Sequence, residues 1–135
     1  MKANLEVQRV MTPFPHTIGL EEPLSVARDM MRSHNIRHLP VQVEGELMGI
    51  VSKRDLDVAM AIDGELLVAD IYTPEPFTVE AETPLDEVLE FMANEAVGCA
   101  LVTHHGNLVG IFTTVDACRG FCNHIRQESP AQNWR

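Results

Sequence analysis

The sequence predicts an α+β fold in which two β-α-β-β-α repeats pack sheet to sheet about a pseudo-two-fold axis. The first observation behind this prediction is a repeated motif, GIVSKRD at residues 49–55 and GIFTTVD at residues 110–116, 61 positions later. At the same offset, without a gap, the Thr-Pro dipeptide at residues 12–13 matches the one at residues 73–74. A fixed period of this kind indicates a tandem duplication. One copy is too small to bury both faces of its sheet, so the two copies are expected to share a core.

The composition is that of a soluble globular protein. Among the 135 residues, 45% are hydrophobic and 22% are charged, and no apolar run approaches the ~20 residues of a membrane span. The N-terminal residues lack the apolar run of a signal peptide, so we expect a cytoplasmic protein without membrane contact. The cysteines Cys99, Cys118 and Cys122 lie in apolar segments and are predicted to be buried, reduced thiols.

The charge is negative overall and unevenly distributed. A formal net charge of -10 argues against a nucleic-acid binder, which would need a basic surface. No lysine or arginine occurs between Asp55 and Cys118, whereas Arg37, Lys53 and Arg54 lie in the first repeat. An anion site must therefore draw its positive charge from the first repeat.

The first repeat is expected to occupy residues 1–66 and to begin with a lead-in that Pro13 and Pro15 keep extended. A short strand is predicted over residues 16–18. Pro23 then suits the first turn of a helix. The residues that recur at helical spacing in this helix are Leu24, Ala27, Met30, Met31 and His34.

A hairpin and a second helix complete this repeat. Two apolar runs, at residues 38–43 and 47–52, flank a tight turn at residues 44–46 and predict paired strands. The second helix is expected to start near Lys53 and to end before Gly64, a plausible C-terminal stop.

The second repeat, residues 67–127, is expected to follow the same order. A strand is predicted over residues 77–79, and Thr83 is expected to cap a helix with Pro84 inside it. The residues that this helix is expected to bury are Leu85, Val88, Leu89 and Met92.

A hairpin, a last helix and a tail are then predicted. The hairpin strands are expected over residues 99–104 and 108–113, around a turn at residues 105–107. The last helix is expected to bury one apolar stripe, consisting of Val115, Cys118, Cys122 and Ile125. The polar tail, residues 128–135, is expected to be only loosely attached.

Together these elements resemble the cystathionine-β-synthase (CBS) domain pair, also called a Bateman module. The resemblance covers about residues 8–126 and rests on three features: the Val-Met-Thr-Pro opening, the Arg-His-Leu-Pro-Val strand at residues 37–41 and the duplicated Gly-Ile-x-[Ser/Thr]-x-x-Asp motif. It implies the CBS fold and a non-catalytic sensor that requires no cofactor. Such modules commonly bind adenosine-containing ligands, namely AMP, ADP, ATP or S-adenosylmethionine. It further implies a protein partner, as yet unknown, that is regulated in trans.

The resemblance also implies roles for particular residues. The expected ribose-binding residues are Thr113 and Asp116 at a primary site, and Ser52 and Asp55 at a secondary one. The expected phosphate-binding residues are Arg37, His38, Arg54 and Lys53. The expected adenine pocket consists of Thr78, Val79, Ile111, Thr17 and Ile18. The chemistry fits these roles, because a carboxylate accepts hydrogen bonds from vicinal ribose hydroxyls and a guanidinium matches the geometry of a phosphate.

Structural explanations compete with some of these roles. A hydroxyl followed three residues later by an acid, as in Ser52 and Asp55, is also a helix capping box, and capping can coexist with binding. An arginine at a strand end, such as Arg37, can simply be solvated. The candidate ligands of a metal site are His104, His105, Cys118 and Cys122. Turn and core positions account for all four, and no catalytic motif is recognised, so we expect neither a metal nor an enzyme.

The two clefts between the repeats are predicted to be unequal. In the family, the phosphates of a nucleotide held by one repeat are met by the basic strand end of the other. A nucleotide with its ribose on Asp116 would face Arg37. A nucleotide on Asp55 would face only Gly98, Cys99 and Val115 from across the cleft, which carry no positive charge, with Lys53 as a partial compensation. We therefore expect one phosphate-bearing ligand per chain.

An alternative function is a ligand-free dimerisation or protein-interaction module with vestigial clefts. In either case a homodimer is expected, because the helices carry more apolar surface than one monomer needs.

Overall fold

The computed structural model of this chain describes residues 5–128, so the expected tail lies outside the described residues except for Glu128, which ends the last helix. The helices are α1 (Leu24–His34), α2 (Lys53–Ile62), α3 (Val68–Ile71), α4 (Leu85–Glu95) and α5 (Thr114–Glu128), besides a 3-10 helix at Val7–Arg9. The strands are β1 (Thr12–Pro13), β2 (His38–Val43), β3 (Glu46–Ser52), β4 (Thr73–Pro74), β5 (Thr78–Glu80), β6 (Cys99–His104) and β7 (Asn107–Thr113). The predicted α+β fold with two β-α-β-β-α repeats is confirmed.

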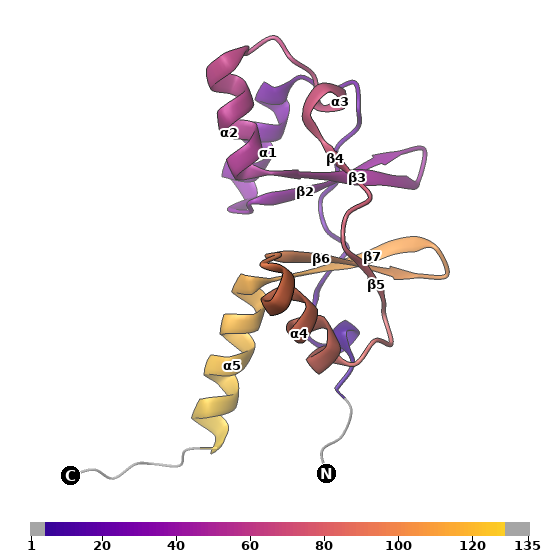
Figure 1. Ribbon diagram of the computed structural model, residues 1–135, viewed down its shortest axis with the longest axis vertical. Helices are drawn as coiled ribbons and strands as arrows, with labels where there is room; N and C mark the ends of the chain where they lie inside the picture. Colours follow the sequence, from indigo (N-terminus) through magenta and orange to yellow (C-terminus); the bar gives the residue numbers. More distant parts are fainter. Residues whose placement is uncertain (1–4, 129–135) are drawn as a thin grey trace, which may run out of the picture.

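Within residues 5–128 the strands form two sheets, with strand orders β1-β7-β6-β5 and β2-β3-β4. The helices lie at the two ends of the molecule and the sheets meet in the middle (Figure 1). Between the sheets is an apolar layer. Its members are Cys99, Leu101 and Ile111 from the second repeat, with Leu108, Leu47 and Ile50 packed against them. The sheet-to-sheet arrangement solves the problem of covering both faces of a small sheet.

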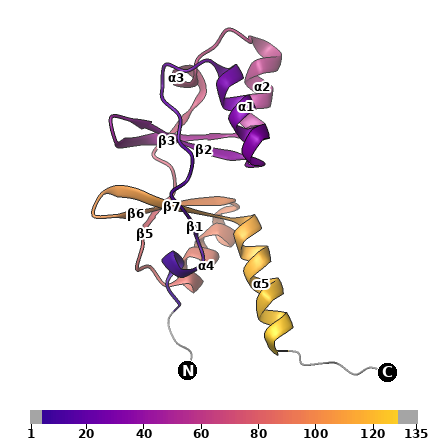
Figure 2. The ribbon, with the colours of Figure 1, turned by 180° about the vertical axis from the view of Figure 1, so that it is seen from behind.

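Each sheet is completed by a segment that comes from outside its own repeat. β1 pairs with β7, where Thr12 lies opposite Ile111, and β4 pairs with β3, where Thr73 lies opposite Ile50. Seen from behind, β1 lies against β7 (Figure 2). The lead-in residue Val7 is fully buried in the core of the second repeat. The duplicated Thr-Pro dipeptides therefore mark a reciprocal exchange of edge strands.

Each hairpin has a two-residue turn in which both residues have a positive φ. Glu44 and Gly45 have φ values of 51° and 83°, and His105 and Gly106 have 53° and 83°. Two-residue hairpin loops of this kind match the twist of the flanking strands, and glycine adopts such a conformation without steric cost. The predicted hairpins are confirmed, with each second strand starting one residue earlier than expected.

The strand predicted over residues 16–18 is wrong, because only Ile18 forms an isolated parallel bridge, to Val41. The duplicated segment explains the difference. In the second repeat the N–H of Leu101 donates to the carbonyl of Phe77 at 2.9 Å, which ties β5 to β6. The residue equivalent to Leu101 is Pro40, which has no N–H to donate. The first repeat therefore lacks one hydrogen bond that would hold this strand.

The capping role expected of Thr83 is also wrong. The N-cap of α4 is Pro84, and no side chain caps the helix. The N–H of Leu85 instead donates to the backbone carbonyl of Leu5 at 2.7 Å. The lead-in thus supplies the hydrogen-bond acceptor for a free N–H at the start of the helix. The sequence pattern had predicted that the Thr83 hydroxyl would supply it.

The stripe on the last helix is exposed rather than buried, which corrects the prediction for four residues. Val115 is 54% and Ile125 46% exposed, and Cys118 and Cys122 are also exposed, so only Cys99 is a buried thiol. Leu89 on α4 is likewise 38% exposed. α5 extends away from its sheet (Figure 1), so most of the helix has nothing in the described chain to pack against.

No helix in the part of the chain that the structure describes combines the length and the apolar character needed to cross a membrane.

Candidate ligand-binding cleft

A cleft of about 510 Å³ lies between the two repeats, and we name it the inter-repeat cleft. The second repeat contributes the end of β7 and the first turns of α5, and the first repeat contributes the lead-in and the start of β2. The residues that line it are Thr12, Pro13, Phe14, Pro15, His16, Asn35, Ile36, Arg37, His38, Ile111, Thr113, Thr114, Val115, Asp116 and Arg119. Its volume falls within the range of small-molecule sites, roughly 300–1,000 Å³.

Asp116 is held in a fixed orientation at the wall of this cleft. Its Oδ2 accepts a hydrogen bond from the Thr113 N–H at 2.9 Å and one from the Thr113 hydroxyl at 3.4 Å. Its Oδ1 accepts a hydrogen bond from the Thr12 hydroxyl at 3.0 Å. The side chain is only 9% exposed. Each carboxylate oxygen has two lone pairs, so Oδ2 is already fully used, whereas Oδ1 can accept one further hydrogen bond from a ligand.

The exchanged strand is what brings Thr12 to Asp116. The pairing of β1 with β7 puts Thr12 beside Ile111, at the end of the sheet where α5 begins. Sequence reasoning missed Thr12 as a site residue, although the repeated Thr-Pro dipeptide was a visible signal. It also missed Arg119, whose guanidinium lies 4.0 Å from Asp116, one helical turn further along α5.

The opposite wall supplies positive charge and a neutral imidazole. Arg37 is exposed and His38 is half-buried at the start of β2. Burial lowers the pKa of His38 below its ordinary value of 6.5, and the positive charge of Arg37 lowers it further. His38 is therefore neutral at pH 7 and can donate or accept a hydrogen bond, while Arg37 carries the charge.

The structure places the remaining predicted site residues elsewhere. Among the described residues that line the inter-repeat cleft, Ile111 is the sole member of the predicted adenine pocket. Ile18 is buried in the core of the first repeat, Val79 packs on the core of the second, and the Thr78 hydroxyl donates to the carbonyl of Pro76. The predicted site residues that do not line this cleft are Thr17, Ile18, Thr78, Val79, Ser52, Lys53, Arg54 and Asp55.

The equivalent turn in the first repeat shows capping geometry. The Asp55 N–H donates to the Ser52 hydroxyl at 3.2 Å, and Ser52 is the N-cap of α2. At the strand end that corresponds to Arg37 and His38, the second repeat has Gly98 and Cys99. Burial and the nearby charge of Asp116 raise the pKa of Cys99 to about 12, so this thiol stays neutral.

Known proteins resemble this chain in sequence and in fold. The family model described as CBS domain matches residues 7–61 and 68–121. Inosine-5'-monophosphate dehydrogenase from Korarchaeum cryptofilum (strain OPF8) is 40% identical over 101 residues, which are 74% of this chain and 21% of the dehydrogenase. The chain thus spans about a fifth of the length of that relative.

Two solved structures share the fold at moderate sequence identity. The protein AcuB from Vibrio cholerae is 29% identical with a TM-score of 0.86, over 92% of this chain and 96% of that one. The CBS domain pair of protein MJ0100, in complex with 5'-methylthioadenosine and S-adenosyl-L-methionine, is 27% identical with a TM-score of 0.83, over 90% of this chain and 99% of that one. From its duplicated motif, its fold and these matches, the chain belongs to the CBS domain family, of which it contains a tandem pair.

Proposed function

We propose that this protein is a regulatory module that binds an adenine nucleotide in the inter-repeat cleft and signals its occupancy to a protein partner in trans. One observation carries the proposal: a single cavity has the fixed carboxylate of Asp116 on one wall and, on the other, the guanidinium of Arg37, which has no ion-pair partner among residues 5–128. The similarity to the MJ0100 pair, which binds adenosyl compounds, supports an adenosine-containing ligand.

The proposed contacts follow from the chemistry of each wall. One ribose hydroxyl donates to the remaining lone pair of Asp116 Oδ1, and the N-terminus of α5 faces the ligand beside Thr113. The phosphate lies toward Arg37, with His38 as a neutral hydrogen-bond donor. The base packs against Ile111 and the exposed ring of Phe14, both of which line the cleft.

The same chemistry predicts which adenosine-containing ligands bind the cleft more tightly. AMP and ADP carry the anionic group that a guanidinium binds best, whereas S-adenosylmethionine carries a sulfonium cation that Arg37 would repel. We therefore place the phosphate-bearing nucleotides ahead of S-adenosylmethionine as ligands of this cleft.

Isothermal titration with AMP, ADP, ATP and S-adenosylmethionine tests the proposal. We expect one nucleotide per chain, binding that Asp116→Asn strongly weakens, and binding that the matched variant Asp55→Asn preserves. A thermal shift supplies a second readout, because a ligand at 100 times its dissociation constant adds about 2.7 kcal/mol of stability. Two equal sites, or dependence on Asp55 in place of Asp116, would contradict the assignment.

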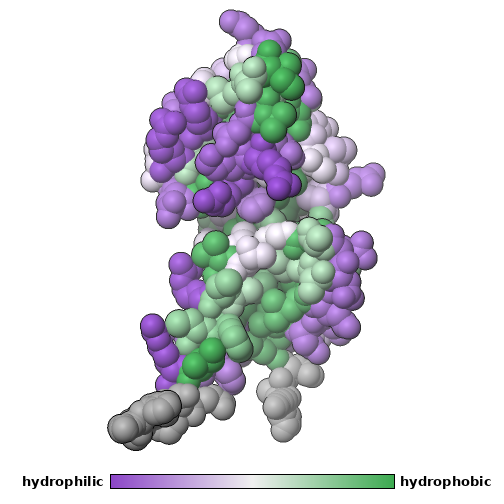
Figure 3. Space-filling view, turned by 60° about the vertical axis from the view of Figure 1, so that its left-hand side comes forward, coloured by the Kyte–Doolittle hydropathy of each residue, from purple (hydrophilic) through white to green (hydrophobic). Residues whose placement is uncertain are grey.

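A ligand-free interaction module is the second candidate, and the exposed face of α5 favours it. Phe121 is 66% exposed, in line with the exposed apolar residues already described on this helix. On the face shown in Figure 3, hydrophobic residues gather over the second repeat, and hydrophilic residues dominate the first. We propose that a second copy of the chain covers this face as a homodimer. No response to any adenosine ligand, together with a stable dimer, would favour this function over sensing.

A further inference from the structure

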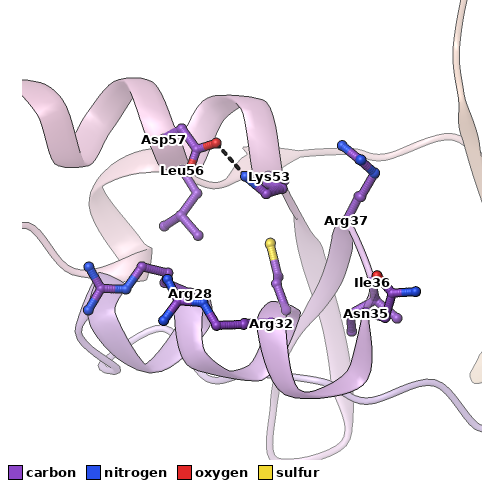
Figure 4. A pocket seen from close by; sticks show the side chains of 9 residues that line it. Arg28, Arg32, Asn35, Ile36, Arg37, Lys53, Leu56 and Asp57 are labelled. Atoms are coloured by element: carbon purple, nitrogen blue, oxygen red, sulfur yellow. Dashed lines mark hydrogen bonds and ion pairs between the residues drawn. The ribbon is translucent and has the colours of Figure 1, made fainter.

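A second cavity, of about 300 Å³, lies between α1 and α2, and we name it the helix cleft. Its floor is apolar, with Met31 and Leu56 buried and Ile36 beside them. Its other lining residues are Arg28, Arg32, Asn35, Arg37, Lys53 and Asp57. Arg28 and Arg32 extend from α1, Lys53 and Asp57 extend from α2 across the cavity, and Arg37 stands at one side (Figure 4).

The cationic lining is unusual for this chain. It brings together Arg28, Arg32, Arg37 and Lys53 in a protein with 10 lysines and arginines and a net charge of -10. Like charges at close range repel one another, so the cluster is less favourable when nothing anionic lies between its members. Two helix ends of opposite polarity meet here, because Lys53 is the first residue of α2 and Asn35 is the C-cap of α1, so the positive charge of the cavity comes from its side chains.

The carboxylates nearby neutralise only part of the cluster. Lys53 Nζ lies 2.7 Å from Asp57 Oδ2, and Arg28 Nε lies 3.8 Å from Asp29 Oδ1. Within residues 5–128, neither Arg32 nor Arg37 has a carboxylate within ion-pair distance. Two guanidinium groups at one cavity therefore remain free to bind an anion.

Several phosphates in a row match this site better than a single one. Each guanidinium presents a planar fork of donors that fits the oxygens of a phosphate, and the cations of the helix cleft are distributed around a cavity larger than one phosphate group. A linear polyphosphate can contact several of these side chains at once. An extended apolar ligand would leave the cations unpaired.

We propose that the helix cleft binds a linear polyphosphate group. The group has two possible sources, a free inorganic polyphosphate or the distal phosphates of a nucleotide. Arg37, Asn35 and Ile36 line both this cavity and the inter-repeat cleft, so the two cavities meet at this segment. The inference goes beyond the proposed function and does not depend on it, because Arg28 and Arg32 do not line the inter-repeat cleft.

Titration of the full chain with inorganic tripolyphosphate at low salt tests the site directly. The variant R28Q/R32Q removes two guanidinium groups from exposed helix positions and keeps good helix formers there. We expect it to weaken tripolyphosphate binding about tenfold or more, as for the loss of a hydrogen bond to a charged group. The matched variant R9Q/R126Q removes the same charge from exposed positions outside both cavities and is expected to change binding less than about threefold.

Titrations with ATP and AMP distinguish the two possible sources of the polyphosphate group. If the polyphosphate belongs to a nucleotide, R28Q/R32Q weakens ATP binding about tenfold and leaves AMP binding unchanged. If it is a free ion, the variant weakens tripolyphosphate alone. The proposal is overturned if the wild-type chain binds neither tripolyphosphate nor ATP, or if both double variants weaken binding equally. It is also overturned if R28Q/R32Q leaves binding intact and dissociates a dimer, since the arginines would then contact a second copy.

Discussion

The two repeats have the same architecture and different chemistry at equivalent positions. Both place a Gly-Ile-x-[Ser/Thr]-x-x-Asp turn at a strand end, and both receive a Thr-Pro edge strand from outside the repeat. The cleft that contains Asp116 also has Phe14, Arg37 and Arg119 in its lining. The positions equivalent to these three are Glu75, Gly98 and Val58. The duplication therefore preserved the residues that build the scaffold, while these three residues of the Asp116 cleft differ from their counterparts in the other repeat.

The largest expected difference between the repeats concerns a pair of equivalent glycines. A Cβ on Gly49 would collide with the backbone carbonyl of Thr73, whereas a Cβ on Gly110 would collide with the flexible side chain of Met11. We expect Gly49→Ala to cost about 3 kcal/mol of unfolding free energy and Gly110→Ala about 1 kcal/mol, because only a side chain can move aside. Urea denaturation of both variants measures the difference. Equal losses would show that the exchanged strands are equally adaptable.

The charge asymmetry between the clefts gives the second prediction. Arg37→Ala should remove a charge-assisted contact to phosphate worth roughly 1.5–3 kcal/mol, which corresponds to a 10- to 150-fold loss of AMP affinity. Arg54→Ala is the control, because Arg54 is exposed and does not line the inter-repeat cleft. Calorimetry that gives the two variants the same affinity would remove the assigned role of Arg37.

The exposed apolar helix of the second repeat gives the third prediction. Phe121→Asp should weaken the homodimer by about 2 kcal/mol, or roughly 30-fold, because a charge would be buried at the contact. The comparison variant is Ile62→Asp, at a position on α2 that is 77% exposed. It should leave the dimer nearly unchanged. Light scattering over a concentration series measures the dissociation of the dimer for both variants. A wild type that is monomeric at tens of micromolar would contradict the prediction.

The smallest expected effect is a pH dependence confined to the first repeat. The pKa of His38 is lowered in the folded protein, so the unfolded chain binds more protons as the pH falls below about 6.5. Its contribution to stability is present above pH 6.5 and is lost as the pH falls through the lowered pKa. Cys99, in the equivalent position, stays neutral throughout this range. Urea midpoints at pH 7.5 and 5.5 should fall further for the wild type than for His38→Gln, and equal falls would exclude His38 as the source.

The duplication explains how much of the fold was predictable. Hairpins around Gly45 and Gly106 carry strong local signals, and the helices follow from periodic apolar residues. The edge strands are two residues long and have no periodicity, so their exchange between repeats could not be predicted. The pattern on α5 showed an apolar stripe, but periodicity alone does not tell whether the surface that covers it belongs to the same chain.

Part of the candidate site was also predictable, because some of its residues belong to sequence motifs. Asp116 and Arg37 stand in recognisable motifs, and the structure brings both into one cavity. Thr12 reaches that cavity only through strand exchange, and Arg119 is an exposed helix residue without a motif. Conversely, Arg54 belongs to the Ser52 and Asp55 motif, and no residue of that motif lines the inter-repeat cleft.

The exchange of edge strands also bears on how the chain folds and opens. The hydrogen bond from Phe14 N–H to the carbonyl of Val109, 2.9 Å long, joins segments near the two ends of the described chain. Contacts between residues so distant in sequence require a large loop to close, which slows folding. They also make the two repeats open together, since releasing β1 or β4 strips an edge from the sheet of the other repeat. The amide hydrogen of Phe14 should exchange when β1 separates from β7, at a lower free energy than the amides of the interior strand β6.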